Sequence, residues 1–314
     1  MSEVKKIATR LSYGQELVEL GKEHEDVVVF DADLALATRT DLFREAFPDR
    51  HIECGIAEQN MYDAAAGLST MGLVPFASTF AMFSAGRAFE MIRNTIGYAR
   101  LNVKIAATHG GVSVGEDGAS HQCCEDFALM RTIPGMIVMC PSDDVEARKM
   151  VRAAYAHKGP VYMRFSRAAS PVFHAEDAPF EIGKAEILKE GPDGAIIANG
   201  ILVSEALKAV EMLAEEGIHP RLINMATIKP LDKEAVLKAA GECGFLITVE
   251  EHSIIGGLGE AVCACVCESC PVPVTRIGIQ DRFGHSGSAA ELLEEYGLTA
   301  PYIAKAVRIR KGLE

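Results

Sequence analysis

The sequence predicts an α/β fold with two domains, each built from a mostly parallel sheet flanked by helices. Short apolar runs of strand length recur along the chain, and amphipathic stretches of helical length separate them. This alternation is typical of parallel sheets that helices cover on both faces. Residues 168–184 interrupt the pattern with two prolines and no clear periodicity, which indicates a linker between two such units.

In the first unit, residues 54–67 (CGIAEQNMYDAAAG) predict a helix rich in small residues. The strands expected there are VVVF (27–30), VKIAA (103–107), MIVMC (136–140) and PVYMRF (160–165). We therefore assign residues 1–170 to a first domain, a size normal for an independent domain.

Regular alternation resumes after a linker at residues 171–184, and residues 185–314 form the second predicted domain. A helix is expected at 204–217 (SEALKAVEMLAEEG), and the expected strands are AIIAN (195–199), RLINM (221–225), FLITVE (245–250) and VTRIGI (274–279). No internal repeat interrupts this order.

Composition excludes several classes of protein. With 49% hydrophobic and 24% charged residues, the chain has the make-up of a globular protein rather than a disordered or fibrous one. Its net charge of −13 leaves no positive excess for nucleic acid or an anionic membrane, so neither is an expected partner. The first ten residues lack the apolar core of a signal peptide, and no apolar run approaches membrane-spanning length, so we expect a cytoplasmic enzyme.

The nine cysteines are expected to be reduced thiols, because their number is odd and several lie in apolar segments. Four of them crowd residues 263–270, but Cys265 points away from the others at helical spacing. A packed helix is therefore favoured over a zinc site, and no metal ligand is assigned to this chain.

Glu58 falls in the first turn of the predicted helix at 54–67. Acidic residues favour helix starts because they complement the positive end of the helix dipole, which is the simpler explanation. If Glu58 is instead buried among Ile56, Met61 and another chain, it could share a proton with a basic nitrogen of a ligand.

Two further segments carry candidate residues. Phe80 and Phe83 are three residues apart and are expected on one helix face, where an aromatic pair is more often core than part of a cofactor site. The loop at 108–122 (THGGVSVGEDGASHQ) directly follows an expected strand, where parallel sheets bind ligands. It contains two histidines and two carboxylates, His109, Glu116, Asp117 and His121, which suit proton transfer, although a mobile surface loop is the alternative.

Together, the strings GIAEQNM, TFAMF, THGGVSVGEDGASHQ, RFSR and TVEEHSIIGGLG resemble, in order and spacing, the carboxy-terminal half of transketolases. The resemblance spans essentially the whole chain. It implies a thiamine diphosphate-binding pyrimidine domain followed by a transketolase C-terminal domain. GIAEQ also recurs in deoxyxylulose phosphate synthases and in 2-oxoacid dehydrogenase β subunits, whereas the GEDG-x-x-HQ loop favours transketolase.

The resemblance also implies roles for individual residues. Glu58 matches the glutamate that hydrogen-bonds the aminopyrimidine ring nitrogen of thiamine diphosphate and is catalytic. The resemblance implies that the cofactor is bound by Asp33, Leu34, Phe80 and Phe83. It implies that His109 and His121 are catalytic and assist proton transfer on the sugar. It also implies that the substrate is bound by Asp117, Arg10 and Arg167, and that the two arginines bind its terminal phosphate.

Some positions depart from the family pattern. A third aromatic is replaced by Gly86, the family's His-Asp is His109-Gly110, and a phosphate-contacting serine is replaced by Ala37. We expect Thr38 or Thr40 to take over that phosphate contact. These differences leave the identity of the sugar phosphates open.

The G-D-G motif that holds Mg²⁺ and the diphosphate in thiamine enzymes does not occur in its usual context. The resemblance therefore implies a split transketolase, in which an N-terminal subunit supplies the diphosphate-binding domain and Mg²⁺. An α2β2 heterotetramer with a homodimer contact, acting on sugar phosphates, satisfies that geometry. The alternatives are a 2-oxoacid dehydrogenase β subunit and a noncatalytic scaffold subunit.

Overall fold

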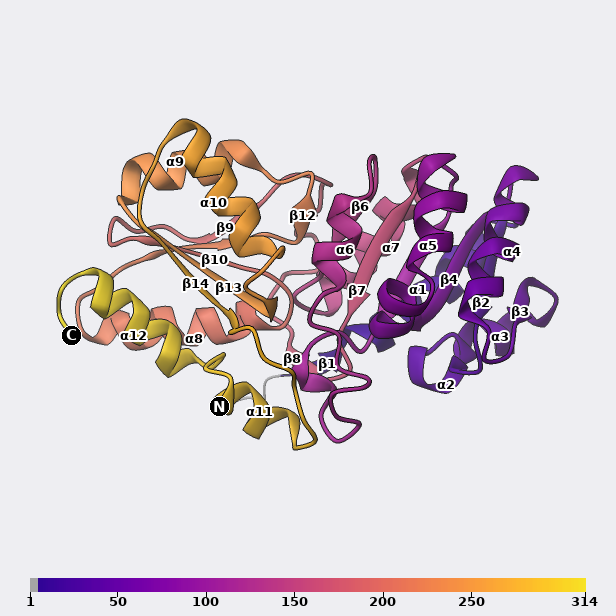
Figure 1. Cartoon of the computed structure of the whole chain (residues 1–314), viewed down its shortest axis with the longest axis horizontal. Coiled ribbons are helices and arrows are strands. Elements are labelled where there is room, and N and C mark those ends of the chain that lie inside the picture. Colours follow the sequence, from indigo (N-terminus) through magenta and orange to yellow (C-terminus); the bar gives the residue numbers. More distant parts are fainter. Residues whose placement is uncertain (1–4) are drawn as a thin grey trace.

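The computed structural model describes residues 5–314, which form two lobes placed side by side (Figure 1). Each lobe has a mostly parallel sheet between two layers of helices. The predicted α/β fold with two sheets is confirmed.

The first lobe is built on a seven-stranded sheet with the order β12-β6-β7-β5-β4-β2-β3. Its strands are parallel except for β12, which is antiparallel to β6. The strands are β2 (Val27–Asp31), β3 (His51–Glu53), β4 (Val74–Phe80), β5 (Lys104–Thr108), β6 (Ile137–Met139), β7 (Val161–Phe165) and β12 (Thr227–Lys229).

Helices cover both faces of this sheet, and two apolar clusters lie between the helices and the strands. One face packs against α1 (Thr9–Glu23), α3 (Asp41–Ala46) and α7 (Asp144–Ala156). The other packs against α4 (Glu58–Thr70), α5 (Phe89–Met91), α6 (Asp126–Thr132) and the π-helical segments η2 (Met82–Arg87) and η3 (Ile92–Tyr98). Shorter elements are α2 (Ala35–Thr38), η1 (Pro48–Arg50) and η4 (Val112–Val114).

Strand β4 is the main element that we did not expect from the sequence. All seven of its residues are buried, but Pro75, Ser78 and Thr79 interrupt the apolar run, so the segment shows neither a continuous apolar stretch nor a regular alternation. The prediction that Phe80 and Phe83 share a helix face is wrong, because Phe80 ends β4 and Phe83 lies in η2. Their rings nevertheless stack, with centroids 5.7 Å apart.

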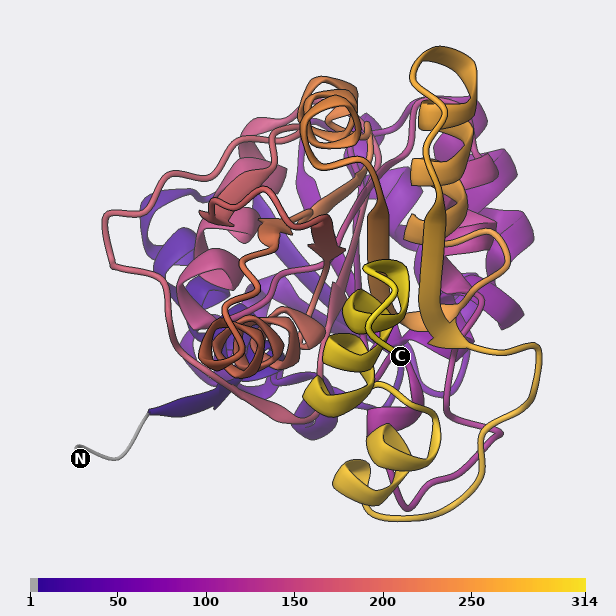
Figure 2. The same ribbon diagram turned by 90° about the vertical axis from the view of Figure 1, so that its left-hand side faces the viewer.

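The second lobe has a five-stranded sheet with the order β14-β13-β10-β11-β9, in which only β9 is antiparallel. Helices lie on both sides of it, as the end-on view in Figure 2 shows. The strands are β9 (Glu186–Lys189), β10 (Ala195–Ala198), β11 (Arg221–Asn224), β13 (Leu246–Ser253) and β14 (Val274–Ile279); the helices are α8 (Leu202–Glu215), α9 (Lys233–Cys243), α10 (Leu258–Ser269), α11 (Ala289–Glu295) and α12 (Ala300–Arg310).

The lobes are joined by more than a linker. Strand β12 belongs to the second half of the sequence but extends the first sheet beside β6 (Figure 1). The two-stranded sheet of β1 (Lys6–Ala8) and β8 (Ala169–Pro171) ends where the predicted linker begins, and residues 172–185 of the described chain contain neither helix nor strand. The division into residues 1–170, 171–184 and 185–314 stays a prediction, and residues 1–4 lie outside the described part.

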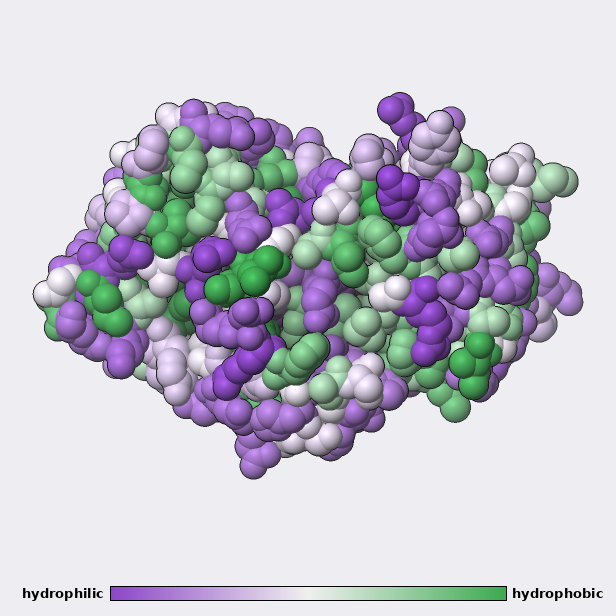
Figure 3. All heavy atoms as spheres, in the orientation of Figure 1, coloured by the Kyte–Doolittle hydropathy of each residue, from purple (hydrophilic) through white to green (hydrophobic). Residues whose placement is uncertain are grey.

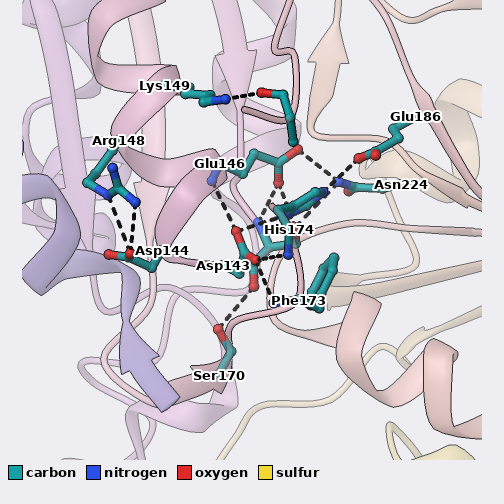
Figure 4. Close-up of polar contacts among 12 residues, drawn as sticks. Asp143, Asp144, Glu146, Arg148, Lys149, Ser170, Phe173, His174, Glu186 and Asn224 are labelled. Atoms are coloured by element: carbon teal, nitrogen blue, oxygen red, sulfur yellow. Dashed lines mark hydrogen bonds and ion pairs between the residues drawn. The ribbon is translucent and has the colours of Figure 1, made fainter. Parts of the chain in front are cut away.

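His174, in the predicted linker, is the centre of a buried polar cluster between the lobes (Figure 4). Its ring nitrogens lie 3.0 Å from Asp143 Oδ1 and 2.6 Å from Glu186 Oε2. Asp143 also accepts hydrogen bonds from the backbone N–H groups of Phe173 and His174. Glu146 of α7 accepts from Asn224 of β11, so Asp143, just before α7, and Glu146 together hold both the linker and the second sheet.

The surface in Figure 3 is largely hydrophilic, with hydrophobic groups in separate patches. Within residues 5–314, no helix has the length and apolar character needed to cross a membrane. The nine cysteines are free thiols, and Cys265 packs into the second lobe from α10.

Candidate functional site

The candidate residues of the first lobe gather at one edge of its sheet. Strands β2, β3, β4 and β5 are parallel neighbours, so the segments that follow them leave the sheet on the same side. Asp33 follows β2, α4 with Glu58 follows β3, Phe83 follows β4, and His109 follows β5. This is the edge where open parallel sheets bind ligands.

Glu58 is the first residue of α4 and is only 2% exposed. Arg87 Nη1 donates to both of its carboxylate oxygens, at 3.1 Å each. The Arg87 guanidinium also lies over the Phe83 ring, 4.8 Å from the ring centroid, and its side chain is 50% exposed. Glu58 therefore begins a helix, as the simpler explanation expects, and it is buried beside Arg87 although Ile56 is exposed. Its contact with another chain and with a ligand nitrogen stays a prediction.

Four rings form a continuous group next to this ion pair. Phe80 stacks on His109, with centroids 3.9 Å apart, and on Phe83. His121 meets the edges of both phenylalanines, at 6.1 Å from Phe80 and 5.5 Å from Phe83. The alternative that the aromatic pair is ordinary core fits Phe80, which is 6% exposed, but Phe83 is only partly buried. The structure thus brings together four residues that lie up to 41 positions apart in the sequence.

His109 lies in an electropositive setting. Its Nδ1 lies 2.8 Å from Thr108 Oγ1, and its Nε2 lies 3.4 Å from Arg10 Nη1. Burial, followed by the nearby charges of Arg10, Arg167 and His121, lowers the pKa of His109 to about 3. The imidazole is therefore neutral at physiological pH and can donate or accept one hydrogen bond at each nitrogen according to its tautomer.

The two arginines predicted to bind phosphate lie near each other. Burial, then the charges of Arg167 and Arg39, lowers the pKa of Arg10. Arg10 Nη1 donates to Ala37 O at 2.7 Å, and Arg167 donates to Val114 O and to Glu116 Oε2. Guanidinium groups that repel one another beside a neutral imidazole favour the binding of an anion.

The segment containing Asp33 and Leu34 is held by carboxylates that the sequence analysis missed. Glu53 Oε1 accepts from the backbone N–H groups of Asp33 at 2.8 Å and Gly55 at 2.7 Å, so one oxygen ties this segment to the segment before Glu58. Asp31 accepts from Leu34 N and lies 2.8 Å from His51 Nε2. Burial raises the pKa of Asp31, but hydrogen bonds with His51, Glu53 and Leu34 outweigh it and leave the pKa lowered. The sequence signal for this network was an acidic residue at the end of each of the neighbouring strands β2 and β3.

The loop at 108–122 is partly buried and hydrogen-bonded within itself, unlike a mobile surface loop. Its carboxylates have other surroundings than its histidines. It contains the short helix η4, and Gln122 donates to Val112 O and Gly115 O. Glu116 pairs with Arg167 at 2.8 Å, and Asp117 is exposed. Among the described residues, neither carboxylate is hydrogen-bonded to His109 or His121, and the proton-transfer role of the two histidines stays a prediction.

Thr38 and Thr40 do not replace the phosphate-contacting serine. Both are completely buried, and their hydroxyls lie 3.0 Å apart. Thr40 donates to Asp31 Oδ2, and Thr38 donates to Leu34 O, so both point into the fold. That prediction is wrong, because a completely buried hydroxyl is out of reach of a substrate.

In the second lobe, the polar end of β13 has a structural role. Glu250 accepts from the backbone N–H groups of Leu258 and Gly259 at the start of α10, at 2.7 and 2.8 Å. A Cβ on Gly257 would lie 2.1 Å from Glu250 Oε2, which explains the glycines there by close packing. Glu251 binds Ser113, so it joins this lobe to the loop of His109. Across residues 5–314, no three His, Cys, Asp or Glu side chains form a group that could hold a metal ion.

The arrangement fits the pyrimidine end of thiamine diphosphate. A buried carboxylate with a half-exposed partner can exchange that partner for a ring nitrogen, and Phe80 and Phe83 offer apolar surface beside it. For Mg²⁺, the described residues contain no group of three or more His, Cys, Asp or Glu side chains that could hold the ion.

Comparison with known families agrees with this geometry. The family model of the transketolase pyrimidine binding domain matches residues 5–172, and that of the transketolase C-terminal domain matches residues 183–303. The two matched ranges together cover most of the chain.

The chain also resembles individual proteins over nearly its whole length. It is 50% identical over 301 residues to the putative transketolase C-terminal section of Methanocaldococcus jannaschii, covering 95% of this chain and 94% of that protein. It is 41% identical to a 6-deoxy-6-sulfo-D-fructose transketolase subunit of a Clostridium species, covering 95% and 92% of the two proteins. A solved structure described as a split gene transketolase, inactive β4 tetramer, superimposes with a TM-score of 0.91 at 50% identity, covering 98% of both chains. The chain belongs to the transketolase family.

Proposed function

We propose that this chain is the C-terminal subunit of a thiamine diphosphate-dependent transketolase, which moves a two-carbon ketol unit between ketose and aldose phosphates. The observation that carries the proposal is the buried Glu58 carboxylate beside the group of Phe80, Phe83, His109 and His121. Bound thiamine diphosphate would supply the nucleophile and electron sink for cleaving the bond next to the sugar carbonyl.

Each predicted residue has a distinct task in this proposal. Glu58 binds the aminopyrimidine ring nitrogen and sets its protonation, and Phe80 and Phe83 pack against the ring. His109 is neutral, so it positions a sugar hydroxyl by hydrogen bonding and can accept a proton. His121 is partly exposed at the rim, where it can reach a substrate that enters from solvent.

Arg10, Arg167 and Asp117 would bind the substrate. The positive field of the two arginines suits a terminal phosphate, which accepts hydrogen bonds from a planar guanidinium. Exposed Asp117 can accept hydrogen bonds from sugar hydroxyls. The relative named for a sulfonated fructose supports a different anionic group as the second candidate at this position.

An N-terminal transketolase subunit would complete the site by holding Mg²⁺ and the diphosphate. The names of the relatives, a C-terminal section and a subunit, support a division of the enzyme between two chains. The exposed Leu36 and Ile56, at 74% and 76%, flank the predicted cofactor edge and offer apolar surface to the partner subunit. An α2β2 assembly would bring such a subunit to each copy of this chain.

Reconstitution tests the proposal. The chain, its N-terminal partner, thiamine diphosphate and Mg²⁺ should together release glyceraldehyde 3-phosphate from xylulose 5-phosphate when ribose 5-phosphate is present. Omission of either chain should abolish the release. A complex that forms but transfers nothing, with phosphorylated or sulfonated sugars, would reject the proposal and leave a scaffold subunit.

A further inference from the structure

We propose that Arg87 is a positioning residue that keeps Glu58 in its carboxylate form before the cofactor binds, and that cofactor binding exchanges this ion pair for a proton. This inference rests on the proposed role of Glu58 in binding the aminopyrimidine. It adds a residue with a defined task and a net proton uptake that is measurable apart from catalysis.

The ion pair is unequal in its exposure to solvent. Glu58 is 2% exposed, whereas the side chain of Arg87 is 50% exposed. One nitrogen, Nη1, contacts both carboxylate oxygens at 3.1 Å, so the pair lacks the two parallel hydrogen bonds of a strong guanidinium–carboxylate interaction. Arg87 can therefore move into solvent at low cost, while Glu58 has to stay.

The local fold places Arg87 next to the predicted cofactor surface. Phe83 and Arg87 are four residues apart in η2, and its wide π-helical turn puts the guanidinium over the Phe83 ring. Phe83 is the ring predicted to contact the pyrimidine. A pyrimidine that approaches Glu58 along Phe83 must therefore displace Arg87 from both.

The titratable side chains near Glu58 include Tyr62 of its own helix and Arg87 of η2. From its own helix, Tyr62 lies one turn further on, and its phenol bonds Ser84 at 2.6 Å. Burial, with a smaller contribution from Glu58, raises the pKa of Tyr62, so this phenol stays neutral. Among residues 5–314, Arg87 of η2 is the cation that forms an ion pair with Glu58.

The proton balance follows from this geometry. A buried carboxylate that loses its cationic partner binds a proton instead of remaining charged. When the cofactor displaces Arg87, Glu58 takes one proton from solvent and shares it with the ring nitrogen, and Arg87 keeps its charge in water. In Arg87→Met, Glu58 already carries this proton in the free enzyme, so binding takes up about one proton fewer.

Calorimetric titration tests this inference. Thiamine diphosphate with Mg²⁺ is titrated into the assembled complex at neutral pH, in buffers of different ionisation enthalpy, which yields the protons taken up on binding. Arg87→Met should take up about one proton fewer than the wild type. The cofactor affinity of this variant should therefore depend on pH less steeply than that of the wild type, by about a factor of ten per pH unit. Arg87→Lys keeps a cation beside Glu58 and should restore most of the uptake.

Two controls separate the possible results. Arg93→Met removes an exposed arginine of η3 that bonds Asn94 and should behave as the wild type. Glu58→Gln cannot take up a proton and should match Arg87→Met. If Arg87→Met does not assemble, Arg87→Gln takes its place. Equal uptake by the wild type and the Arg87 variant would overturn this inference alone, whereas the absence of binding to the wild type would overturn the proposed function as well.

Discussion

His174 and His109 are both almost completely buried, but the chain surrounds them with opposite charges. His174 lies between Asp143, Glu146 and Glu186. Burial lowers the pKa of His174, but its hydrogen bonds and the nearby carboxylates outweigh burial and raise the pKa to about 10. At His109, burial and the charges of Arg10 and Arg167 act in the same direction and lower the pKa to about 3.

Burial lowers the pKa of both histidines, so the opposite directions of their net pKa shifts come from the charges and hydrogen bonds around each ring. In the cluster around His174, the cation and its carboxylates come from one chain, and their polar atoms largely pair with one another (Figure 4). At the candidate site, positive groups outnumber the carboxylates around His109. Such an excess of positive charge is typical of a site that binds an anionic ligand.

Loss of the Glu58 carboxylate should have the largest effect. Glu58→Gln keeps the volume and leaves assembly intact, but turnover should fall by about 10³-fold, because an amide cannot exchange a proton with the ring nitrogen. The measurement is the steady-state rate of the reconstituted enzyme. Glu90→Gln, at an exposed glutamate of α5, is the matched control, and near-normal turnover of Glu58→Gln would remove its assigned role.

Removal of His174 should lower stability rather than activity. His174→Ala leaves buried Asp143 without its cation and should reduce the free energy of unfolding by about 3 kcal/mol near neutral pH. Chemical denaturation of the wild type and the variant measures this difference. His219→Ala, at an exposed histidine, should change stability little.

The pH dependence of that difference identifies its cause. The folded-state pKa of His174, about 10, lies above its ordinary value, so its contribution is complete below about pH 6.5 and is lost as the pH rises toward 10. The pKa of Asp143 is lowered overall, since its bonds with His174 and Glu146 outweigh burial, and its contribution is lost as the pH falls below the ordinary carboxyl range. A stability difference that persists unchanged at high pH would contradict the ionic explanation.

Arg167→Ala should have the smallest effect. KM for phosphorylated sugars should rise by about tenfold with little change in kcat, because one of two guanidinium groups remains. Arg44→Ala, at an exposed arginine of α3, is the control. An equal rise in KM for unphosphorylated acceptors would show that Arg167 acts by holding Glu116 and the loop instead of the phosphate.

Much of the fold could be predicted because strand and helix signals are local. The apolar runs at 27–30 and 195–199 became β2 and β10, and Glu58 begins a helix as expected. Strand β4 is as buried as β2 and β10, but it could not be recognised because Pro75, Ser78 and Thr79 interrupt its apolar run. Strand β12 could not be assigned to the first sheet, because its partner β6 lies almost 90 residues earlier in the chain.

The sequence by itself determined the α/β class, the two sheets and the residue types available at the carboxyl ends of the strands, because hydrophobic period and glycine-rich turns are properties of neighbouring residues. Only the tertiary structure decided which charges meet. It paired Glu58 with Arg87, placed Arg10 beside His109 and turned Thr38 and Thr40 inward. Electrostatic interactions depend on distance in space and on exposure to water, and neither can be read from the order of residues along the chain.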